Sequence, residues 1–318
     1  MTPTTEQPMN GKTVLITGAT SGIGRATAFG LAAMGAQLAI TGRDPDRTQA
    51  VAHEISAVHG GTARFFVADL SAQDEVRRLA HDVLQQLPQI DVLINNAGGC
   101  WDTRHVTVDG LERTFAVNHL APFLLTQLLL NRLRSSVDAR VITVASNAEA
   151  LGRIDFTDLQ GSRAYSGARA YNQSKLANVM FTYELSRRLA GTAVTASALH
   201  PGVVNTRFGA DDPGRLQRFV VPLLRPVMRT PAQGAATTIH LATAPTLIQA
   251  SGGYYANNTR RKSSTRSHDQ AVAARLWQVS EDLTGTPSLS GVRPANGPGR
   301  RGPNRARSRT RRRSRIPV

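Results

Sequence analysis

Short, largely apolar runs alternate with longer segments of helical periodicity along most of this chain, and this alternation limits the folds open to it. The apolar runs are "KTVLIT" (12–17), "AQLAIT" (36–41), "TARFFV" (62–67), "IDVLIN" (90–95), "ARVITVA" (139–145) and "TAVTASAL" (192–199). Strands that are covered on both faces have this composition. Intervening segments such as "SAQDEVRRLAHDVLQQL" carry apolar residues at helical spacing. The alternation therefore predicts an α/β fold with a single doubly wound parallel sheet.

The C-terminal end of the chain differs from the rest in composition. Residues 286–318 contain ten arginines, no acidic residue and few apolar residues, so we expect a disordered Arg/Gly/Pro-rich tail after one domain over residues 1–285. Because ten of the +16 formal charges lie in the tail, residues 1–285 carry only +6. Two interpretations of the tail stay open: an accessory segment, or an arm that binds nucleic acid or another polyanion weakly. The absence of aromatic residues for base stacking favours the first.

Composition also excludes several classes of protein. A chain of 318 residues with 41% hydrophobic content can bury one sizeable core. No run approaches the roughly 18–20 apolar residues that a membrane span needs, and the N-terminus has no signal-peptide pattern. Cys100 is the only cysteine, and the eight histidines lack metal-ligand spacing, so we expect no metal site. A cytoplasmic location is the default prediction.

A glycine-rich turn follows the first predicted strand. In "TGATSGIG" (17–24), Gly18, Gly22 and Gly24 lie between this strand and the start of a helical segment. Glycines let the backbone turn tightly and approach a pyrophosphate, whose charge is favoured at a helix N-terminus. The turn lacks the Gly-Lys-Ser/Thr of phosphate-cleaving loops. It therefore predicts a dinucleotide-binding site.

Arg43 bears on which dinucleotide is bound. It follows Gly42 at the end of the second predicted strand, where a ribose-binding carboxylate is often found. An acidic residue there would repel a 2′-phosphate, whereas arginine offers a planar fork for one. Arg43, with Arg25 as a second cation, predicts NADP(H) as the preferred cofactor, and Asp44 leaves NAD(H) open. The alternative is that both arginines are solvated surface residues.

Ordered motifs over about residues 10–285 resemble the short-chain dehydrogenase/reductase family, and the stretch around residues 158–185 looks most like its retinol-dehydrogenase-type branch. Besides the glycine turn, the motifs are "ADL" (68–70), "NNAG" (95–98), "AVNHLAPFLLT" (116–126), "VITVAS" (141–146), "YNQSK" (171–175) and "HPGVVNT" (200–206). The resemblance implies a Rossmann-like fold. With Arg43 added, the predicted cofactor contacts are Gly18, Ser21, Gly22, Ile23, Gly24, Arg43, Asp69, Leu70, Asn96, Ala97, Gly98, Tyr171, Lys175, Pro201, Gly202, Val204 and Thr206.

The same resemblance implies a catalytic set of Asn118, Ser146, Tyr171 and Lys175. Residues i and i+4 share one helical face, so Lys175 lies near Tyr171 and is expected to lower its pKa. A tyrosine tuned in this way exchanges a proton with an alcohol or carbonyl while a hydride moves to or from nicotinamide. The resemblance implies that Ser146 hydrogen-bonds the substrate oxygen and that Asn118 supports a water relay and positions the lysine.

Two other side chains compete for roles at this site. Tyr165 also has a cation four residues later, but Arg169 does not deprotonate and is less suited to a proton relay. His200 is expected to be structural. Ser146 and Tyr171 are 25 residues apart, which is a longer interval than in many family members but similar to that of the retinol-dehydrogenase-type branch.

The predicted function is that of an oxidoreductase that moves a hydride between NADP(H) and an alcohol or carbonyl substrate. Residues 203–231, where the family's variable lid lies, are rich in apolar side chains and suggest a hydrophobic substrate, although packing against the domain explains the same residues. Two alternatives are an NADP-sensing regulator without turnover, which the intact catalytic set opposes, and a nucleic-acid binder acting through the tail. A homo-oligomer stays open.

Overall fold

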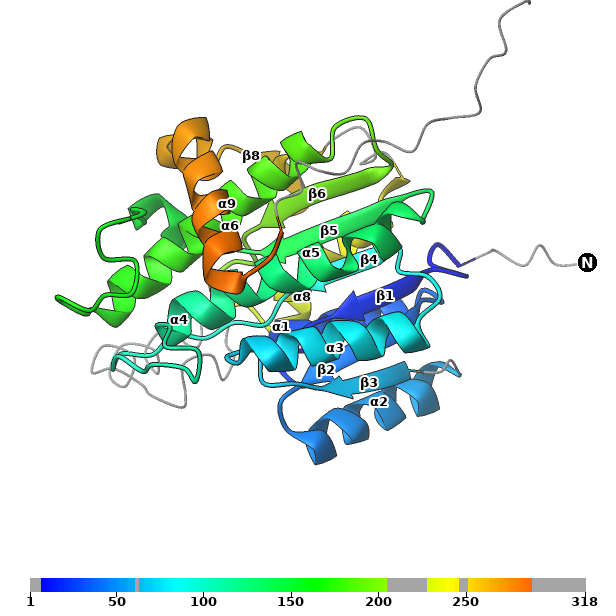
Figure 1. Ribbon diagram of the computed structural model, residues 1–318. Helices are drawn as coiled ribbons and strands as arrows, with labels where there is room; N and C mark the ends of the chain where they lie inside the picture. The colour runs from blue at the N-terminus through cyan, green and yellow to red at the C-terminus, as the bar shows by residue number, and fades with distance from the viewer. Residues whose placement is uncertain (1–6, 61–62, 205–227, 246–250, 288–318) are drawn as a thin grey trace, which may run out of the picture. The chain divides into compact units, whose positions relative to one another are not determined.

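The central feature of the protein is one twisted sheet. In this computed structural model, residues 7–60, 63–204, 228–245 and 251–287 are described; Thr206, most of the predicted lid and the tail after residue 287 lie outside them. Within the described residues the sheet has eight strands in the order β3-β2-β1-β4-β5-β6-β7-β8 (Figure 1). The strands are β1 (Thr13–Ile16), β2 (Gln37–Gly42), β3 (Ala63–Val67), β4 (Val92–Asn95), β5 (Ala139–Val144), β6 (Val194–Leu199), β7 (Gly253–Ala256) and β8 (Thr259–Arg261).

Strands β1 to β7 pair in parallel, and the six apolar runs of the sequence form the first six of them. Every residue of β1, β4, β5 and β6 is buried, which agrees with the absence of polar alternation in their sequences. The predicted doubly wound parallel α/β fold is therefore confirmed. Chain order runs outward in both directions from the β1–β4 pair, and ligands bind at the carboxyl ends of strands at such a switch point.

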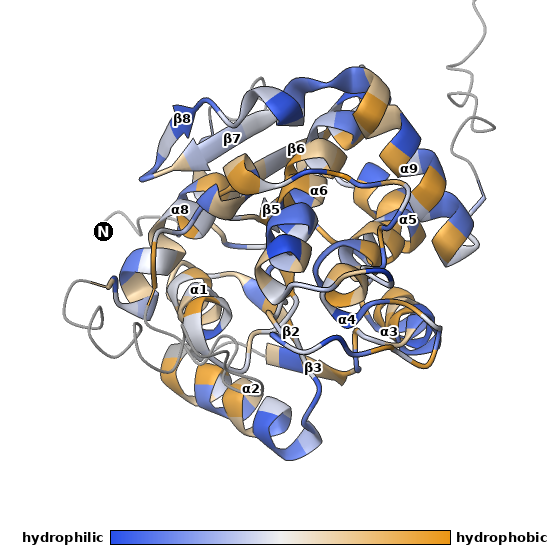
Figure 2. Ribbon diagram, turned by 90° about the vertical axis from the view of Figure 1, so that its left-hand side faces the viewer, coloured by the Kyte–Doolittle hydropathy of each residue, from blue (hydrophilic) through white to orange (hydrophobic). Residues whose placement is uncertain are grey.

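Helices cover both faces of the sheet (Figure 2). One face carries α1 (Gly22–Ala32), α2 (Pro45–His59) and α8 (Pro231–Thr243), and α1 packs against α8. The other carries α3 (Gln73–Gln86), α5 (Ala121–Arg134) and α6 (Gly167–Arg188), and α9 (Gln270–Thr284) packs on α6. The described residues also form short helical segments: α4 (Arg113–Phe115), the π-helix η1 (Ala116–Leu120), and the 3₁₀ helices η2 (Asn147–Leu151) and η5 (Thr265–His268).

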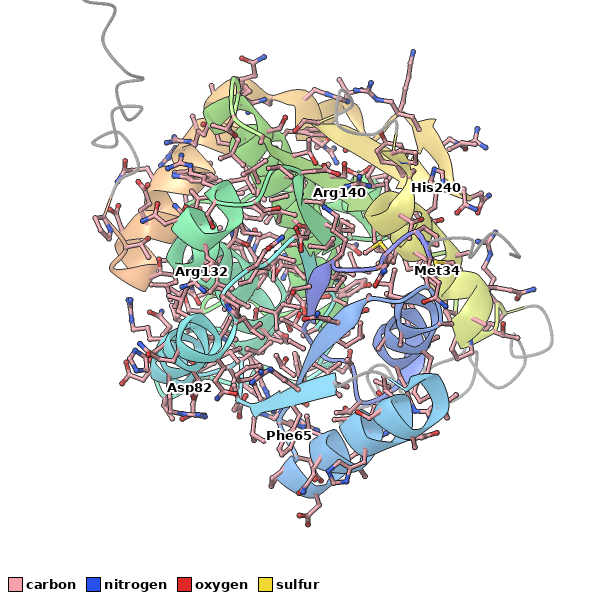
Figure 3. All side chains as sticks on the ribbon, turned by 90° about the vertical axis from the view of Figure 1, so that its right-hand side faces the viewer. Met34, Phe65, Asp82, Arg132, Arg140 and His240 are labelled. Carbon is pink, nitrogen blue, oxygen red and sulfur yellow. The ribbon has the colours of Figure 1, made fainter. Side chains whose placement is uncertain are left out.

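Polar side chains make long-range contacts at the amino-terminal ends of the parallel strands. Arg140 of β5 donates to the carbonyl oxygens of Leu241 (3.0 Å) and Ala244 (2.8 Å), which the end of α8 would otherwise leave unpaired (Figure 3). Buried Asp91 accepts the Thr13 amide N–H at 2.8 Å and joins the starts of β1 and β4. These contacts lie at the opposite end of the strands from the carboxyl edge, where ligands bind in such sheets.

The edge hairpin β7–β8 is the part of the sheet that the sequence did not predict. It is antiparallel, and its turn is Asn257–Asn258, with φ of 53° and 61°. Left-handed conformations at both central positions suit a type I′ turn, which asparagine tolerates. β8 is exposed along its whole length and has the sequence Thr-Arg-Arg, so no apolar run marks this hairpin. Separately, no helix among the described residues has the length and apolarity to span a membrane.

Candidate active site

The glycine turn lies where the strand order reverses, between β1 and α1. Gly18 has φ +65°, and a β-carbon there would lie 2.9 Å from the Cα of Ala97 in the segment after β4. A β-carbon on Gly24 would collide with the side-chain nitrogen of Asn96 and the carbonyl oxygen of Gly18. These two positions therefore require glycine. No side-chain hydrogen bond from Ser21 caps α1 in the structure as described, so the first-turn N–H groups face the edge where a pyrophosphate would lie.

Two polar side chains hold the turn against the β4 segment. The Asn96 side chain donates to the carbonyl oxygens of Thr17 (2.8 Å) and Gly18 (3.1 Å). The Thr17 hydroxyl accepts the backbone N–H groups of Asn96 and Ala97, both at 3.0 Å. Asn96 was predicted to contact the cofactor, whereas Thr17 was not predicted at all. The available signal was its position directly before Gly18 at the end of a strand.

Arg43 and Asp69 lie at the carboxyl ends of the next two strands, and both are exposed. The Asp69 carboxylate accepts the Ser71 amide N–H at 2.9 Å, which fixes the turn into α3. Leu70 lies near Thr17 and Ala97, beside the glycine turn. The observed positions suit one nucleotide: pyrophosphate at the turn, adenine near Asp69 and Leu70, and a ribose phosphate near Arg43.

Arg25 and Asp44, which bear on the choice of cofactor, are both engaged within the protein. Arg25 forms an ion pair with Glu54 of α2 and lies 4.4 Å above the centre of the Phe29 ring. The Asp44 carboxylate caps α2 by accepting the Arg47 amide N–H at 2.9 Å. Arg25 is thus held by contacts with α1 and α2, while Arg43 directly follows β2.

The segment after β6 lies beside the glycine turn. A β-carbon on Gly234 of α8 would lie 2.7 Å from Val204 and 3.2 Å from Ile23, so these two predicted cofactor contacts meet at one place on α8. Arg229, which the sequence analysis missed, packs over Gly202, whose β-carbon would lie 2.6 Å from the arginine Cδ. Pro201 is buried beside them.

Asn118 lies in the π-helix η1 and is fully buried. Its side-chain nitrogen donates to the carbonyl oxygen of Gly99 and to the Ser174 hydroxyl, both at 2.9 Å, and its side-chain oxygen accepts the Gly99 amide N–H at 2.8 Å. A β-carbon on Gly98 would lie 3.0 Å from this oxygen and 3.5 Å from the Lys175 ammonium nitrogen. Gly98 thus lets Asn118 and Lys175 approach each other. Neither Gly99 nor Ser174 was predicted, because their link to the site runs through the Asn118 side chain.

Ser146 follows β5 and faces Tyr171 of α6. The Ser146 hydroxyl accepts the Ala148 amide N–H at 3.2 Å and hydrogen-bonds the Tyr171 phenol. Burial raises the pKa of Tyr171 to about 12, and the hydrogen bond with Ser146 offsets part of that rise. Desolvation of the phenolate therefore outweighs the lowering expected from Lys175, and the pKa of the Tyr171 phenol lies above its usual value.

Lys175 is fully enclosed one turn after Tyr171. Its ammonium nitrogen donates to the carbonyl oxygen of Val144 at 3.1 Å and lies 5.6 Å from the centre of the Tyr171 ring. Burial lowers the pKa of Lys175 to about 8, because the charged form loses its hydration. A lysine with this pKa carries its charge at neutral pH and can release its proton close to neutrality.

Tyr165, the competing tyrosine, is engaged in a structural network. Its hydroxyl donates at 3.0 Å towards the Glu112 carboxylate and the Trp101 carbonyl oxygen, and burial raises its pKa. Glu112 is itself buried and caps α4 through the amide N–H groups of Thr114 and Phe115. A carboxylate beside the phenol opposes phenolate formation, so Tyr165 is poorly placed for proton transfer.

His200 lies at the carboxyl edge of the sheet, directly after β6. The His200 ring nitrogen accepts the Asn147 amide N–H at 3.2 Å, and burial lowers its pKa, so the ring is a neutral structural partner. In the part of the chain that the structure describes, no three His, Cys, Asp or Glu side chains are grouped to hold a metal ion. The described arrangement suits proton transfer beside a dinucleotide.

Comparisons with known proteins agree with this geometry. A protein-family model described as short chain dehydrogenase matches residues 12–214. Mouse retinol dehydrogenase 14 is 40% identical over 297 residues, which cover 87% of each chain. A crystal structure of an uncharacterized protein from Mycobacterium paratuberculosis is 36% identical with a TM-score of 0.71, covering 87% of this chain and 94% of that one. A Beutenbergia cavernae protein solved with NADP at low occupancy is 29% identical with a TM-score of 0.63, covering 78% and 96%.

Proposed function

Because the chain belongs to the short-chain dehydrogenase family, and is an oxidoreductase of alcohol and carbonyl groups that uses a nicotinamide cofactor, we propose that it prefers NADP(H) and acts on a hydrophobic alcohol or ketone. The predicted family resemblance and enzyme class are confirmed. The observation that carries the proposed proton chemistry is the convergence of Tyr171, Ser146 and Lys175 on one edge beside the glycine turn.

Three observations support the choice of cofactor and substrate. Arg43 directly follows β2, where a ribose 2′-phosphate would lie, while Asp44 is engaged in capping α2. A relative of 29% identity was solved with NADP. Relatives that are about 40% identical are named for retinol, which is an apolar alcohol.

We assign the proton chemistry to this chain's own side chains. In carbonyl reduction, the Tyr171 O–H donates its proton to the substrate oxygen while Ser146 hydrogen-bonds that oxygen. The resulting phenolate is stabilised by the Lys175 ammonium group, and Asn118 holds Gly99 and Ser174 in place beside it. Bound NADPH supplies the hydride, and in alcohol oxidation NADP⁺ accepts it. The regulator without turnover is disfavoured, because a sensor needs no proton donor.

The test is the Tyr171→Phe variant, with Tyr165→Phe as its matched control. Losing the proton donor should lower turnover by about 10²–10⁴-fold while cofactor affinity changes little. Tyr165→Phe should be much milder, since that hydroxyl serves the Glu112 network. NADPH and NADH oxidation would be followed with aliphatic, aromatic, steroid and retinoid carbonyls. Near-wild-type turnover in Tyr171→Phe would overturn the mechanism, and activity restricted to polar carbonyls would overturn the substrate class.

The remaining predictions stand as predictions. Cytoplasmic location, assembly into a homo-oligomer and weak polyanion binding by the tail are predictions from the sequence.

A further inference from the structure

The π-helix that carries Asn118 needs support from its surroundings. In η1 the Ala121 amide N–H bonds the carbonyl oxygen of Ala116, one residue farther back than in an α-helix. Such single π-turns are rare and occur mainly at functional sites. A support that holds this turn therefore bears on where the Asn118 amide points.

His119, the neighbour of Asn118 in η1, makes such a contact. Its ring is 1% exposed and its Nε2 lies 2.9 Å from the hydroxyl of Ser280 in α9. The Ser280 hydroxyl donates to the carbonyl oxygen of Leu276 at 2.8 Å, so it accepts from His119 and Nε2 carries the hydrogen. Burial lowers the pKa of His119 to about 3, and a hydrogen bond with the Asn178 side chain offsets part of that fall, so the ring is neutral.

The aromatic surroundings of His119 make this contact specific. The ring centre lies 5.0 Å from that of Phe115 and 6.3 Å from those of Phe123 and Phe181. These three rings offer the Nε2 hydrogen no oxygen or nitrogen acceptor. The Ser280 hydroxyl, 161 residues away in the chain, supplies one. A buried donor that loses its acceptor is unfavourable, so the ring and the turn that carries it would shift.

We propose that His119 and Ser280 are positioning residues, through which the C-terminal helix α9 holds the π-turn and so fixes the Asn118 amide against Gly99 and Ser174. This inference rests on the proposed function, because it treats Asn118 as part of the catalytic set. It makes α9, which lies at the end of the described chain, a component of the active site without any contact to substrate.

Ser280→Ala tests the proposal, and Thr284→Val is its matched control. The Thr284 hydroxyl is also buried in α9 but donates to the carbonyl oxygen of Ser280 at 2.6 Å. Both changes remove one buried hydroxyl from the same helix, and only Ser280→Ala removes the hydroxyl that the His119 Nε2 hydrogen reaches. We expect Ser280→Ala to lower kcat about 10- to 100-fold with little change in KM, because catalytic groups lose rate when misplaced by small distances. Thr284→Val should keep the wild-type kcat at a comparable loss of thermal stability.

His119 provides a second arm. A glutamine amide can place an N–H near the position of Nε2, so His119→Gln should retain much more kcat than His119→Leu. Both variants would be assayed together with their unfolding temperatures. Equal kcat values at similar unfolding temperatures would overturn the proposal, because the hydrogen bond would then play no part in turnover.

The Asn118→Ala background separates this inference from the proposed function. If Ser280 acts through Asn118, adding Ser280→Ala to Asn118→Ala should lower kcat no further. An undiminished further loss would overturn the inference, as would equal kcat values for Ser280→Ala and Thr284→Val. Wild-type kcat in Asn118→Ala would instead remove Asn118 from the proposed catalytic set, and the inference would fall with it.

Discussion

The two sides of the sheet's carboxyl edge differ in the groups that form them: backbone groups on the β1–β4 side and side chains on the β5–α6 side. On the β1–β4 side, the glycine turn is shaped by missing β-carbons and by backbone groups that Thr17 and Asn96 hold. On the β5–α6 side, the features are the buried Lys175 and the partly buried Tyr171, whose pKa values desolvation displaces. Backbone recognition depends on space, whereas proton transfer depends on desolvation and charge. Substitutions on the β1–β4 side should therefore change cofactor binding, and substitutions on the β5–α6 side should change turnover and its pH dependence.

Gly18→Ala should give the largest effect on the cofactor side. The change forces alanine into a φ of +65° and places its methyl 2.9 Å from the Cα of Ala97. We expect cofactor affinity to fall by about 100-fold or more, which corresponds to roughly 3 kcal/mol, because the turn must move away from the pyrophosphate. Fluorescence titration with NADPH and with NADH measures the affinity.

Gly110→Ala is the matched control for that change. Gly110 has a similar φ of +76°, but a β-carbon there meets nothing within 4 Å. Both variants incur the left-handed strain of roughly 1–2 kcal/mol, and only Gly18→Ala adds a collision. Equal cofactor affinities in the two variants would show that space at the glycine turn does not determine binding.

Arg43→Asp should give a smaller effect, on cofactor choice. A carboxylate opposes a 2′-phosphate and accepts hydrogen bonds from a ribose hydroxyl, so the ratio of kcat/KM for NADP(H) over NAD(H) should fall about 10- to 100-fold. Arg25→Ala is the control, because Arg25 pairs with Glu54 and should change the ratio little. A wild-type preference for NAD(H) would contradict the argument from Arg43.

The pH dependence of reduction tests the catalytic side. Burial lowers the pKa of Lys175 to about 8, so its charged form is lost as the pH rises through that value. Since the ammonium group stabilises the Tyr171 phenolate, kcat/KM for carbonyl reduction should fall about tenfold per pH unit above 8. In Lys175→Arg, whose guanidinium stays charged, this descending limb should vanish even if overall activity is lower. A flat wild-type profile between pH 7 and 9 would assign the phenolate's stabilisation to another group.

The sequence predicted six of the eight strands in the described sheet and the candidate catalytic residues, but not the β7–β8 hairpin. Apolar runs gave six strands because burial on both faces leaves a strong local signal, whereas the β7–β8 hairpin depends on two asparagines with positive φ. Family motifs pointed to Asn118, Ser146, Tyr171 and Lys175, and the structure brings Ser146 to Tyr171 and Asn118 to within reach of Lys175. Whether these residues perform catalysis stays a prediction.

Long-range partners were beyond the sequence. Thr17, Ser174 and Ser280 each act by accepting a hydrogen bond from a residue distant in the chain or in another element. No local sequence pattern around a serine or threonine indicates that it accepts a hydrogen bond from a distant residue. The rise in the pKa of Tyr171 was missed for a related reason, because desolvation depends on everything packed around the phenol.

Removal of the tail is expected to have the smallest effect on turnover. This change compares the charged C-terminal segment with the packed domain. The boundary for the truncation follows from α9: the Thr286 amide N–H bonds the carbonyl oxygen of Glu281 at 3.1 Å, and the Thr284 and Thr286 hydroxyls lie 3.0 Å apart. Thr286 therefore belongs with α9, one residue beyond the boundary that the sequence suggested, and the truncation should begin at residue 288.

Deleting residues 288–318 removes ten arginines and no acidic residue, so it lowers the net charge from +16 to +6. Carbonyl reduction per folded molecule should stay within about twofold of wild type, because none of the candidate site residues lies in the deleted segment. Retention on DNA or RNA at low salt should be largely lost, and in the full chain it should weaken steeply as salt is added, since binding through arginines releases counterions. Steady-state kinetics, circular dichroism and salt-dependent nucleic-acid binding would be compared for the two proteins. Loss of turnover in a truncated protein that remains folded would mean that the tail reaches the active site or an essential interface, and the contrast between a charged segment and a self-sufficient domain would no longer hold.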